Sequence, residues 1–185
     1  ADIAYNSGKA LLTIVNDILD LSKIEAGRIE LDIRPFDLEI AVKDIVSLPE
    51  LQARQKGLGF IYNIDTDVPR RLKGDIGRIR QVLLNFTSNA IKFTENGSVT
   101  LNVRLKEDKE EHALIHFSVD DTGIGINEEV LKGLFAPFVQ ADASITKKYG
   151  GTGLGLWISK QFIELMGGQV GVDSLEMIGS TFWFE

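Results

Sequence analysis

QVLLNFTSNAIKFTENG, residues 81–97, has the pattern of a helix with two different faces. One face is polar and carries Gln81, Asn85, Asn89 and Lys92 in one line, and the opposite face is apolar. Asparagine is a poor residue for a helix interior, so a pair of them indicates either a binding face or a solvated surface. The apolar residues recur at steps typical of a helix that packs against a core, and they are Ile79, Val82, Leu83, Phe86, Ala90 and Phe93.

The whole chain has the composition of a folded globular protein. Its 185 residues are 44% hydrophobic and 25% charged, which is enough for one domain of ordinary size with an additional element. The 27 acidic side chains outnumber the 20 basic ones, so we expect no contact with nucleic acid or with a membrane surface. The absence of cysteine excludes disulfides and thiolate metal sites. No signal peptide or spanning segment is found. The sequence opens on a helix without an initiator Met, so we expect a segment cut from a longer protein, the cytoplasmic portion of a sensor that could be membrane-bound.

A long amphipathic helix is predicted at the start, over residues 3–26, with Gly27 as its stop. An isolated helix of this length is marginal in water, so its apolar face must be covered by another helix. We expect a partner chain to supply that helix, and the alternative is that the face folds back on its own domain. The face consists of Leu11, Leu12, Ile14, Val15, Ile18, Leu19, Leu21 and Ile24.

The rest of the chain alternates helices and strands in an order that predicts an α+β fold. An extended connector is expected to end at Asp37, the cap of a helix that Pro49 kinks or interrupts. Asp75 is expected to cap the helix with two faces. The order favours a mostly antiparallel sheet with helices on one face. Helices are expected at 38–55, 76–94, 127–134 and from the glycine cluster at 151–155 to 166, strands at 58–64, 98–105, 113–121, 169–173 and 180–185, and a hairpin tip at 106–111.

A second informative stretch is the strand ALIHFSVDD, residues 113–121. Its period of two puts Asp121 on the same face as the apolar residues Phe117 and Val119. A buried carboxylate needs donors, and a ligand could supply them. Gly123 and Gly125 follow and would let a backbone approach closely, although an Asp that caps a turn is the alternative.

A third stretch runs from a loop into a helix. Residues 135–151 show no period and are predicted to form a lid. The glycines of GGTGLGL, residues 150–156, then open a helix, and such a start attracts phosphate through its free backbone N–H groups. Together the three stretches predict a nucleotide site: Asp121 accepts from the adenine amine, asparagine oxygens hold magnesium, and Lys92 with the glycines holds phosphates.

In this order and spacing the motifs resemble the catalytic and ATP-binding domain of sensor histidine kinases, in the superfamily of gyrase, heat-shock chaperone and mismatch-repair ATPases. RQVLLNFTSNAIKFT is similar to the asparagine box, DDTGIGI to the first glycine box, LFAPFVQAD to the phenylalanine box and YGGTGLGLWISK to the second glycine box. FVQAD and GSTFWF are typical of hybrid kinases. The resemblance implies a two-layer α/β sandwich of the Bergerat type, with a mixed, mostly antiparallel sheet after a long N-terminal helix.

The resemblance also implies a domain organisation and partners. Residues 1–28 would be the second helix of a dimerisation and phosphotransfer bundle, 29–36 a linker, and 37–185 the catalytic and ATP-binding domain. The intact protein would form a homodimer through the bundle and would act on the receiver domain of a response regulator. Pro49 and the turn SLEMIGSTF depart from the family pattern without touching the nucleotide motifs.

Site residues carried over from the family form one nucleotide site. The resemblance implies that Asn89 binds Mg²⁺ with help from Asn85, that Asp121 accepts from adenine, and that Asn85 and Lys92 are catalytic. The cofactors would be ATP or ADP and Mg²⁺. The nucleotide-binding residues would be Asn85, Asn89, Lys92, Asp121, Gly123, Gly125, Ile126, Phe138, Lys147, Lys148, Tyr149, Gly151, Thr152, Gly153, Leu154, Gly155, Leu156 and Thr181.

One residue type separates kinases from ATPases in this superfamily. The ATPases carry a glutamate as general base one turn before the magnesium asparagine, where this chain has Asn85. An amide cannot take a proton, so transfer to another nucleophile is favoured over hydrolysis. His112 and His116 belong to a strand, so the phosphoacceptor histidine is expected outside this sequence and the fragment is not expected to phosphorylate itself.

Two other functions are compatible with parts of the sequence. The first is a nucleotide-gated regulatory module, a degenerate kinase without transfer activity. The second is a dinucleotide-dependent oxidoreductase built on GGTGLGL, which is disfavoured because the preceding SITKKY, residues 144–149, is not a strand.

Overall fold

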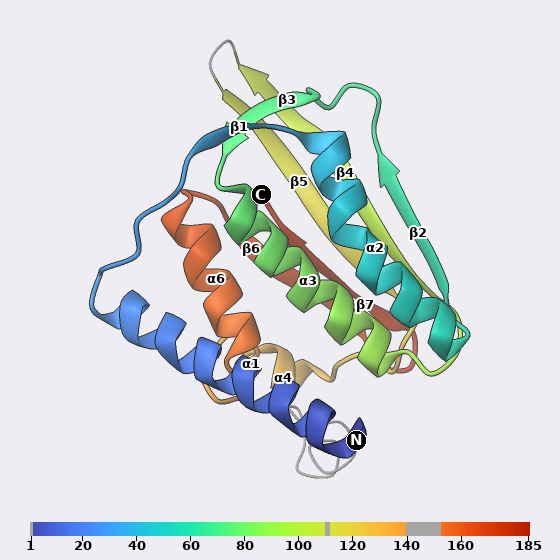
Figure 1. Cartoon of the computed structure of the whole chain (residues 1–185). Coiled ribbons are helices and arrows are strands. Elements are labelled where there is room, and N and C mark those ends of the chain that lie inside the picture. Colours follow the sequence, from blue (N-terminus) through green and yellow to red (C-terminus); the bar gives the residue numbers. More distant parts are fainter. Residues whose placement is uncertain (1, 110–111, 140–152) are drawn as a thin grey trace.

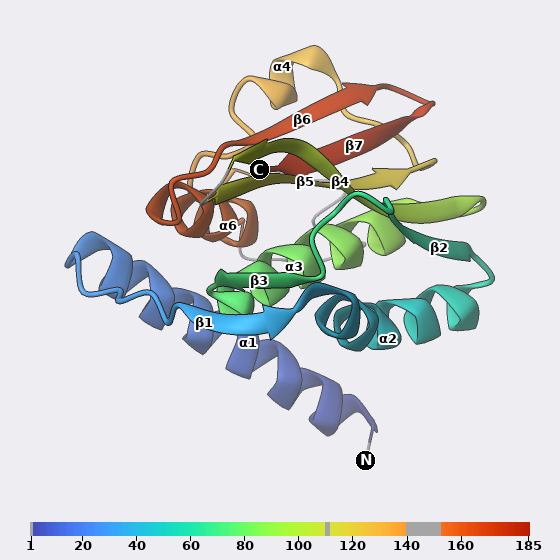
Figure 2. The same cartoon turned by 90° about the horizontal axis from the view of Figure 1, so that it is seen from above.

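The computed structural model describes residues 2–109, 112–139 and 153–185, which form a layer of helices against a sheet (Figures 1 and 2). The helices are α1 (Asp2–Glu25), α2 (Leu38–Lys56), α3 (Ile76–Phe93), α4 (Glu128–Leu131) and α6 (Gly155–Leu165). The strands are β1 (Arg34–Asp37), β2 (Gly59–Ile64), β3 (Arg71–Gly74), β4 (Ser98–Lys109), β5 (His112–Asp121), β6 (Val170–Leu175) and β7 (Gly179–Phe184).

The main sheet has five strands in the order β2-β4-β5-β7-β6. Only the pairing of β2 with β4 is parallel, and the other three pairings are antiparallel. Helices α2, α3 and α6 lie side by side on one face of this sheet (Figure 2). The predicted α+β class and the mostly antiparallel sheet are therefore confirmed.

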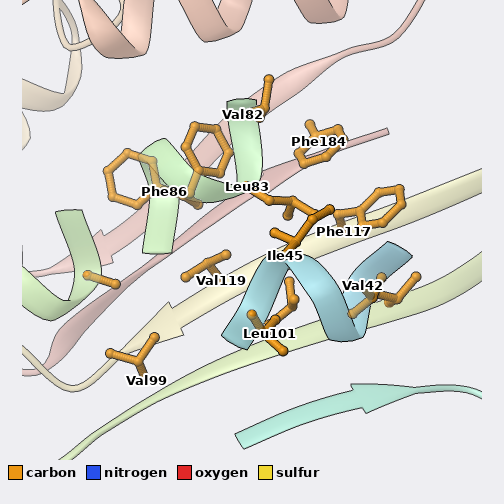
Figure 3. Packing of buried hydrophobic residues seen from close by; sticks show 14 of the residues in the cluster. Val42, Ile45, Val82, Leu83, Phe86, Val99, Leu101, Phe117, Val119 and Phe184 are labelled. Atoms are coloured by element: carbon orange, nitrogen blue, oxygen red, sulfur yellow. The ribbon is translucent and has the colours of Figure 1, made fainter. Parts of the chain in front are cut away.

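The core forms where the apolar stripe of α3 meets β5 and β7 (Figure 3). Val82, Leu83 and Phe86 are fully buried, and the ring of Phe86 lies 5.5 Å from that of Phe182 between centroids. Burial of a side chain of this size contributes about 2 kcal/mol to folding. This packing fixes the rotation of α3 about its axis, so its polar residues must face away from the sheet core.

Helix α1 is only partly covered by the rest of the chain. Leu21 and Ile24 near its C-terminal end pack against the core, whereas Leu11 and Leu12 are 61% and 63% exposed. Its last turns thus fold back on their own domain, and the stripe before them stays open in the single chain. None of the helices among residues 2–109, 112–139 and 153–185 is long and apolar enough to cross a membrane.

The end of the predicted connector instead forms a strand of a small sheet. Strands β1 and β3 pair antiparallel, with Arg34 opposite Gly74 and Asp37 opposite Arg71. The backbone N–H of Asp32 also donates to Asp75 Oδ2 at 3.0 Å. The predicted cap at Asp37 is confirmed, since its side chain accepts from the N–H of Ile40.

Pro49 is expected to kink or interrupt the second helix, and the predicted interruption is wrong. Helix α2 is continuous from Leu38 to Lys56 with Pro49 inside it. Proline cannot donate to the carbonyl of Ile45, but its ring is buried in the core, and that burial offsets the lost hydrogen bond.

Strand β4 runs further than predicted, to Lys109, and contains a β-bulge between Leu105 and Glu107. The residue at the bulge, Lys106, pairs with the carboxylate of Glu185. His116 lies 3.0 Å from the same carboxylate and stacks on Trp183. His116 therefore has a structural environment on the sheet, as expected for a histidine that is not a phosphoacceptor.

Candidate functional site

The polar stripe of α3 divides into two parts, and Gln81 belongs to a contact with α1. Gln81 Nε2 donates to Asp20 Oδ2 at 2.9 Å. Arg78 Nη1 donates to Gln81 Oε1 at 3.1 Å, and its guanidinium lies 4.3 Å from the centroid of the Phe162 ring. Gln81 thus connects helices rather than facing a ligand.

The contact between Gln81 and Asp20 should protect the last turns of α1 from amide hydrogen exchange. Substitution Asp20→Ala removes the acceptor of the Gln81 amide, and one such bond is worth about 1 kcal/mol. We expect amide hydrogen exchange over residues 18–25 to become about fivefold faster, measured by mass spectrometry. The matched control is Asn16→Ala, an exposed position on the same helix; equal protection in Asp20→Ala and the unaltered chain would contradict the contact.

Asn85 and Asn89, one turn further along α3, form the centre of the site together with α6. Asn85 Nδ2 donates to Ser159 Oγ at 3.0 Å, and Asn89 Nδ2 donates to Asn85 Oδ1 at 3.4 Å. Gly155 lies against the same amide, because a Cβ there would stand 2.7 Å from Asn85 Oδ1. The start of the glycine-rich helix therefore meets the asparagine pair directly, with Leu154 buried beneath it and Leu156 half-buried.

Lys92 occupies the last turn of α3. Burial lowers the pKa of its ammonium group, and its Nζ lies 4.8 Å from the centroid of the Phe93 ring. Lys56 at the end of α2 donates to the backbone carbonyls of Ile91 and Lys92 at 2.6 and 2.9 Å. This second lysine satisfies the free carbonyls at the helix end and fixes the position of Lys92.

Asp121 ends β5 on the side of the helical layer, as predicted. Burial raises the pKa of this carboxyl group, against the opposing effect of hydrogen bonds from the backbone of Gly123 and Ser180. The Gly123 bond is 2.8 Å long. A Cβ at Gly123 would stand 2.5 Å from the carbonyl oxygen of Phe93, so this loop lies against the C-terminal end of α3, next to Lys92.

Gly125 and Ile126 are held from the other side by the β6–β7 turn. Gly125 has φ of 66°, and a Cβ there would fall on the carbonyl oxygen of Leu175. The N–H of Met177 donates to Ile124 O at 2.7 Å, and the N–H of Ile126 donates to Ser174 Oγ at 2.9 Å. The loop after Asp121 is therefore fixed between α3 and this turn.

Thr181, by contrast, does not join the site. The register of β5 with β7 places Ser180 opposite Asp121 and Thr181 opposite Asp120. Thr181 Oγ1 donates to Asp120 Oδ1 at 2.6 Å, on the other face of the sheet, where Asn102 also donates to Asp120.

Ser180 is the residue of β7 that the sequence interpretation missed. It is buried beside Asp121, and its hydroxyl lies 2.9 Å from that of Ser174. The signal was present, because Phe182 and Phe184 alternate inward and the same period includes Ser180.

Phe138 near the start of the predicted lid lies beside Gly153, which follows the lid in the glycine-rich segment. Phe138, which is 66% exposed, donates its N–H to the carbonyl of Gly153 at 3.1 Å. Both residues have positive φ, 63° and 72°. The other predicted nucleotide-binding residues of this region, Lys147, Lys148, Tyr149, Gly151 and Thr152, lie outside the described residues.

The motifs of the site lie together on α3, the loop after β5 and the start of α6. Comparison of the sequence with known families finds a match. Residues 74–185 match the family described as histidine kinase-, DNA gyrase B-, and HSP90-like ATPase. The chain belongs to this family. The matched residues include every motif of the site. The family is called the histidine kinase-like ATPase family below.

Curated members of the histidine kinase-like ATPase family resemble the chain over nearly its whole length. The sensor protein GacS of Pseudomonas syringae pv. syringae and the hybrid signal transduction histidine kinase B of Dictyostelium discoideum are each 47% identical to it over 96% of its residues. The chain spans only 20% of the length of the first protein and 9% of the second. It thus corresponds to one part of these relatives.

Solved structures of histidine kinases share the fold. Full-length ShkA in complex with AMPPNP has a TM-score of 0.82 and 37% identity, covering 97% of this chain and 36% of that one. Histidine kinase ThkA in complex with the response regulator TrrA has a TM-score of 0.72 and 30% identity, covering 98% of this chain and 48% of that one.

The donor set of the site fits the chemistry of the histidine kinase-like ATPase family. Amide oxygens of Asn85 and Asn89 are hard ligands of the kind that Mg²⁺ accepts. Asp121 is an acceptor, and Lys92 with the N-terminal end of α6 provides positive charge. Asn85 cannot act as a general base, because an amide does not bind a proton near neutral pH.

Proposed function

We propose that the chain is the ATP-binding kinase core of a hybrid two-component sensor histidine kinase, and that it transfers the γ-phosphoryl group of ATP to a histidine outside these 185 residues. The observation that carries the proposal is the contact of Gly155 with Asn85, which joins the glycine-rich helix start to the asparagine pair. Such a contact lets one ligand meet phosphate donors and metal ligands at the same time.

Each group has a defined role in holding Mg²⁺-ATP. Asp121 accepts a hydrogen bond from the adenine amine, within the loop that Gly123, Gly125 and Ile126 form. Asn89 and Asn85 offer oxygen ligands to Mg²⁺, whose charge would reduce repulsion among the phosphates. Phosphate oxygens are bound by Lys92, by the glycine-rich segment from Gly151 to Leu156, and by Lys147, Lys148 and Tyr149 of the lid. Phe138 of the lid contacts the nucleotide without binding phosphate.

The chemistry at Asn85 favours transfer over hydrolysis. A water molecule beside the γ-phosphate finds no carboxylate at position 85 to take its proton. A histidine nitrogen already carries a lone pair and needs no such base when its ring is neutral. The absence of a carboxylate therefore preserves ATP until the acceptor histidine arrives.

The proposal extends to the organisation of the intact protein. Residues 1–28 correspond to the second helix of a dimerisation bundle, 29–36 to a linker and 37–185 to the catalytic domain. The exposed apolar residues of α1 support a homodimer, because only a further helix would cover them. The ThkA–TrrA complex supports a response-regulator receiver domain as the next partner, and we place these reactions in the cytoplasm.

A reconstitution experiment tests the transfer. The chain is mixed with a separately produced helical bundle that carries the acceptor histidine, in the presence of labelled ATP and Mg²⁺. We expect acid-labile, base-stable phosphate on the bundle and none on the chain alone. Nucleotide binding without any transfer, even to the complete bundle, would contradict the proposal and favour a regulatory module.

A further inference from the structure

Ser159 is a buried hydroxyl on the apolar face of α6, and no part of the nucleotide chemistry above uses it. Its exposed fraction is 2%, and its neighbours along the helix, Ile158, Phe162 and Ile163, are equally buried. A hydroxyl in such surroundings costs free energy unless it is hydrogen-bonded. Its Oγ accepts from the side-chain amide of Asn85 at 3.0 Å.

Ser159 and Gly155 contact the same side-chain amide, that of Asn85. The two residues are four apart, so they lie one turn from each other on the face of α6 towards α3. Gly155 leaves room for the Asn85 oxygen, since a Cβ would approach it to 2.7 Å. Ser159 holds the nitrogen of the same amide. Helix α6 therefore contacts both ends of one carboxamide.

The orientation of this carboxamide determines the orientation of the next one. With Nδ2 of Asn85 bonded to Ser159, its Oδ1 faces Asn89, which presents its own Nδ2 at 3.4 Å. The oxygen of Asn89 is then the end that can face a cation, and Mg²⁺ binds amide oxygen rather than amide nitrogen. If Asn85 were turned over, Asn89 would have to turn as well and present its NH₂ group.

We propose that Ser159 is a positioning residue for magnesium: through Asn85, it sets which end of the Asn89 amide faces the metal. This inference rests on the proposed function, because it assigns a role in the same nucleotide site. Ser159 itself touches neither nucleotide nor metal in this scheme, and its effect passes entirely through Asn85.

The test measures how much Mg²⁺ strengthens nucleotide binding. The affinity of the chain for ADP is determined by calorimetry with Mg²⁺ and with EDTA, for Ser159→Ala, Asn85→Ala and the double variant. We expect Ser159→Ala to reduce the gain from Mg²⁺ about fivefold, as for one lost hydrogen bond, and to leave the affinity in EDTA within about twofold. In the Asn85→Ala background, Ser159→Ala should change nothing further.

A second measurement needs no nucleotide. The side-chain amide signals of Asn85 and Asn89 are observed by nuclear magnetic resonance in the ligand-free chain. Ser159→Ala should shift both pairs of signals, including that of Asn89, which Ser159 does not contact. The matched control is Ser118→Ala, another buried serine, which is bonded to Asp120 on the sheet and should shift neither pair.

The outcomes separate this inference from the proposed function. If the unaltered chain binds no nucleotide, the proposed function fails. If the unaltered chain binds ADP more tightly with Mg²⁺ and Ser159→Ala keeps the whole gain, only the role of Ser159 is overturned. Additive effects in the double variant, or an unshifted Asn89 signal, would overturn it equally.

Discussion

Asp121→Asn should strongly weaken nucleotide binding while making the ligand-free protein more stable. In the function proposed above, the carboxylate of Asp121 accepts from the adenine amine. The substitution replaces its oxygen with either a weaker acceptor or an NH₂ group that opposes the amine. Loss of a charge-assisted hydrogen bond costs about 2–3 kcal/mol, so we expect the affinity for ATP to fall about 100-fold. Calorimetric titration with ADP or a non-hydrolysable analogue measures this change.

The gain in stability follows from the direction of the pKa shift at Asp121. Burial raises its pKa in the folded state above the ordinary value, so the protonated form is favoured there. The corresponding stability is present at pH below the ordinary value and is lost as pH rises through the folded pKa. At neutral pH the ionised group therefore opposes folding, and the uncharged amide that Asp121→Asn introduces should raise the melting temperature of the ligand-free chain.

The same shift predicts how nucleotide affinity depends on pH. Binding requires the ionised carboxylate, so affinity should decline on acidification through a pKa above the usual range of aspartate. This decline should be absent in Asp121→Asn. Lower stability of that variant would indicate that misfolding, not loss of the acceptor, explains its failure to bind.

The neighbouring residue offers a matched control for this substitution. Asp120 lies on the other face of the sheet and accepts from Asn102 and Thr181, each at 2.6 Å. Asp120→Asn makes the same chemical change one residue away. It should reduce the free energy of unfolding by about 1–2 kcal/mol through weaker hydrogen bonds and leave nucleotide affinity within about twofold.

The second large effect is expected for Gly125→Ala. The position has φ of 66°, and a methyl group there would meet the backbone carbonyl of Leu175. Backbone atoms cannot rotate aside as a flexible side chain does, so the loop must leave the β6–β7 turn. We expect the free energy of unfolding to fall by about 2–4 kcal/mol, measured by urea denaturation, through strain and overpacking together.

Gly125→Ala should also lower nucleotide affinity, because Ile124 and Ile126 would lose their hydrogen bonds to Met177 and Ser174. Gly133→Ala is the control, since a Cβ at Gly133 meets nothing within 4 Å. That variant should unfold at the same urea concentration as the unaltered chain. Similar curves for all three proteins would show that the loop accommodates a side chain and that the close approach at Leu175 is not maintained in solution.

Local patterns in the sequence were sufficient to predict most of the fold and the faces on which several candidate site residues lie. The three- and four-residue steps of α3 and the alternation of β5 placed Phe86 in the core and Asp121 towards the helices. Both inferences depend only on residues close in sequence, because helix and strand periods decide which side chains share a face.

Contacts between distant residues could not be predicted in the same way. The polar stripe of α3 suggested one common target, but Gln81 bonds to Asp20, which lies 61 residues earlier. Strands β1 and β3 pair although each has only four residues, too few to show a clear period. Only the tertiary arrangement determines such pairings.

Thr181 shows how the register of a strand decides which face of the sheet a predicted residue occupies. The strand was predicted correctly, and the family motif GSTFWF drew attention to Thr181 instead of Ser180. Counting back in twos from Phe184 through Phe182 would have selected Ser180, the buried neighbour of Asp121. A shift of one residue in a strand exchanges its faces, so motif membership alone cannot select the side chain that reaches a site.

The succession of Asp120 and Asp121 at the end of β5 also limits where the chain can change in length. Inserting one residue between Phe117 and Asp120 would move Asp120 into the place of Asp121, and deleting one would move Asp121 into the place of Asp120. In both cases the two carboxylates would change faces of the sheet. The bulge between Leu105 and Glu107 already accommodates one extra residue in the neighbouring strand β4. Extra sequence, such as an epitope tag or a fluorescent reporter, therefore belongs at the hairpin end of these strands, where the register of Asp121 is preserved.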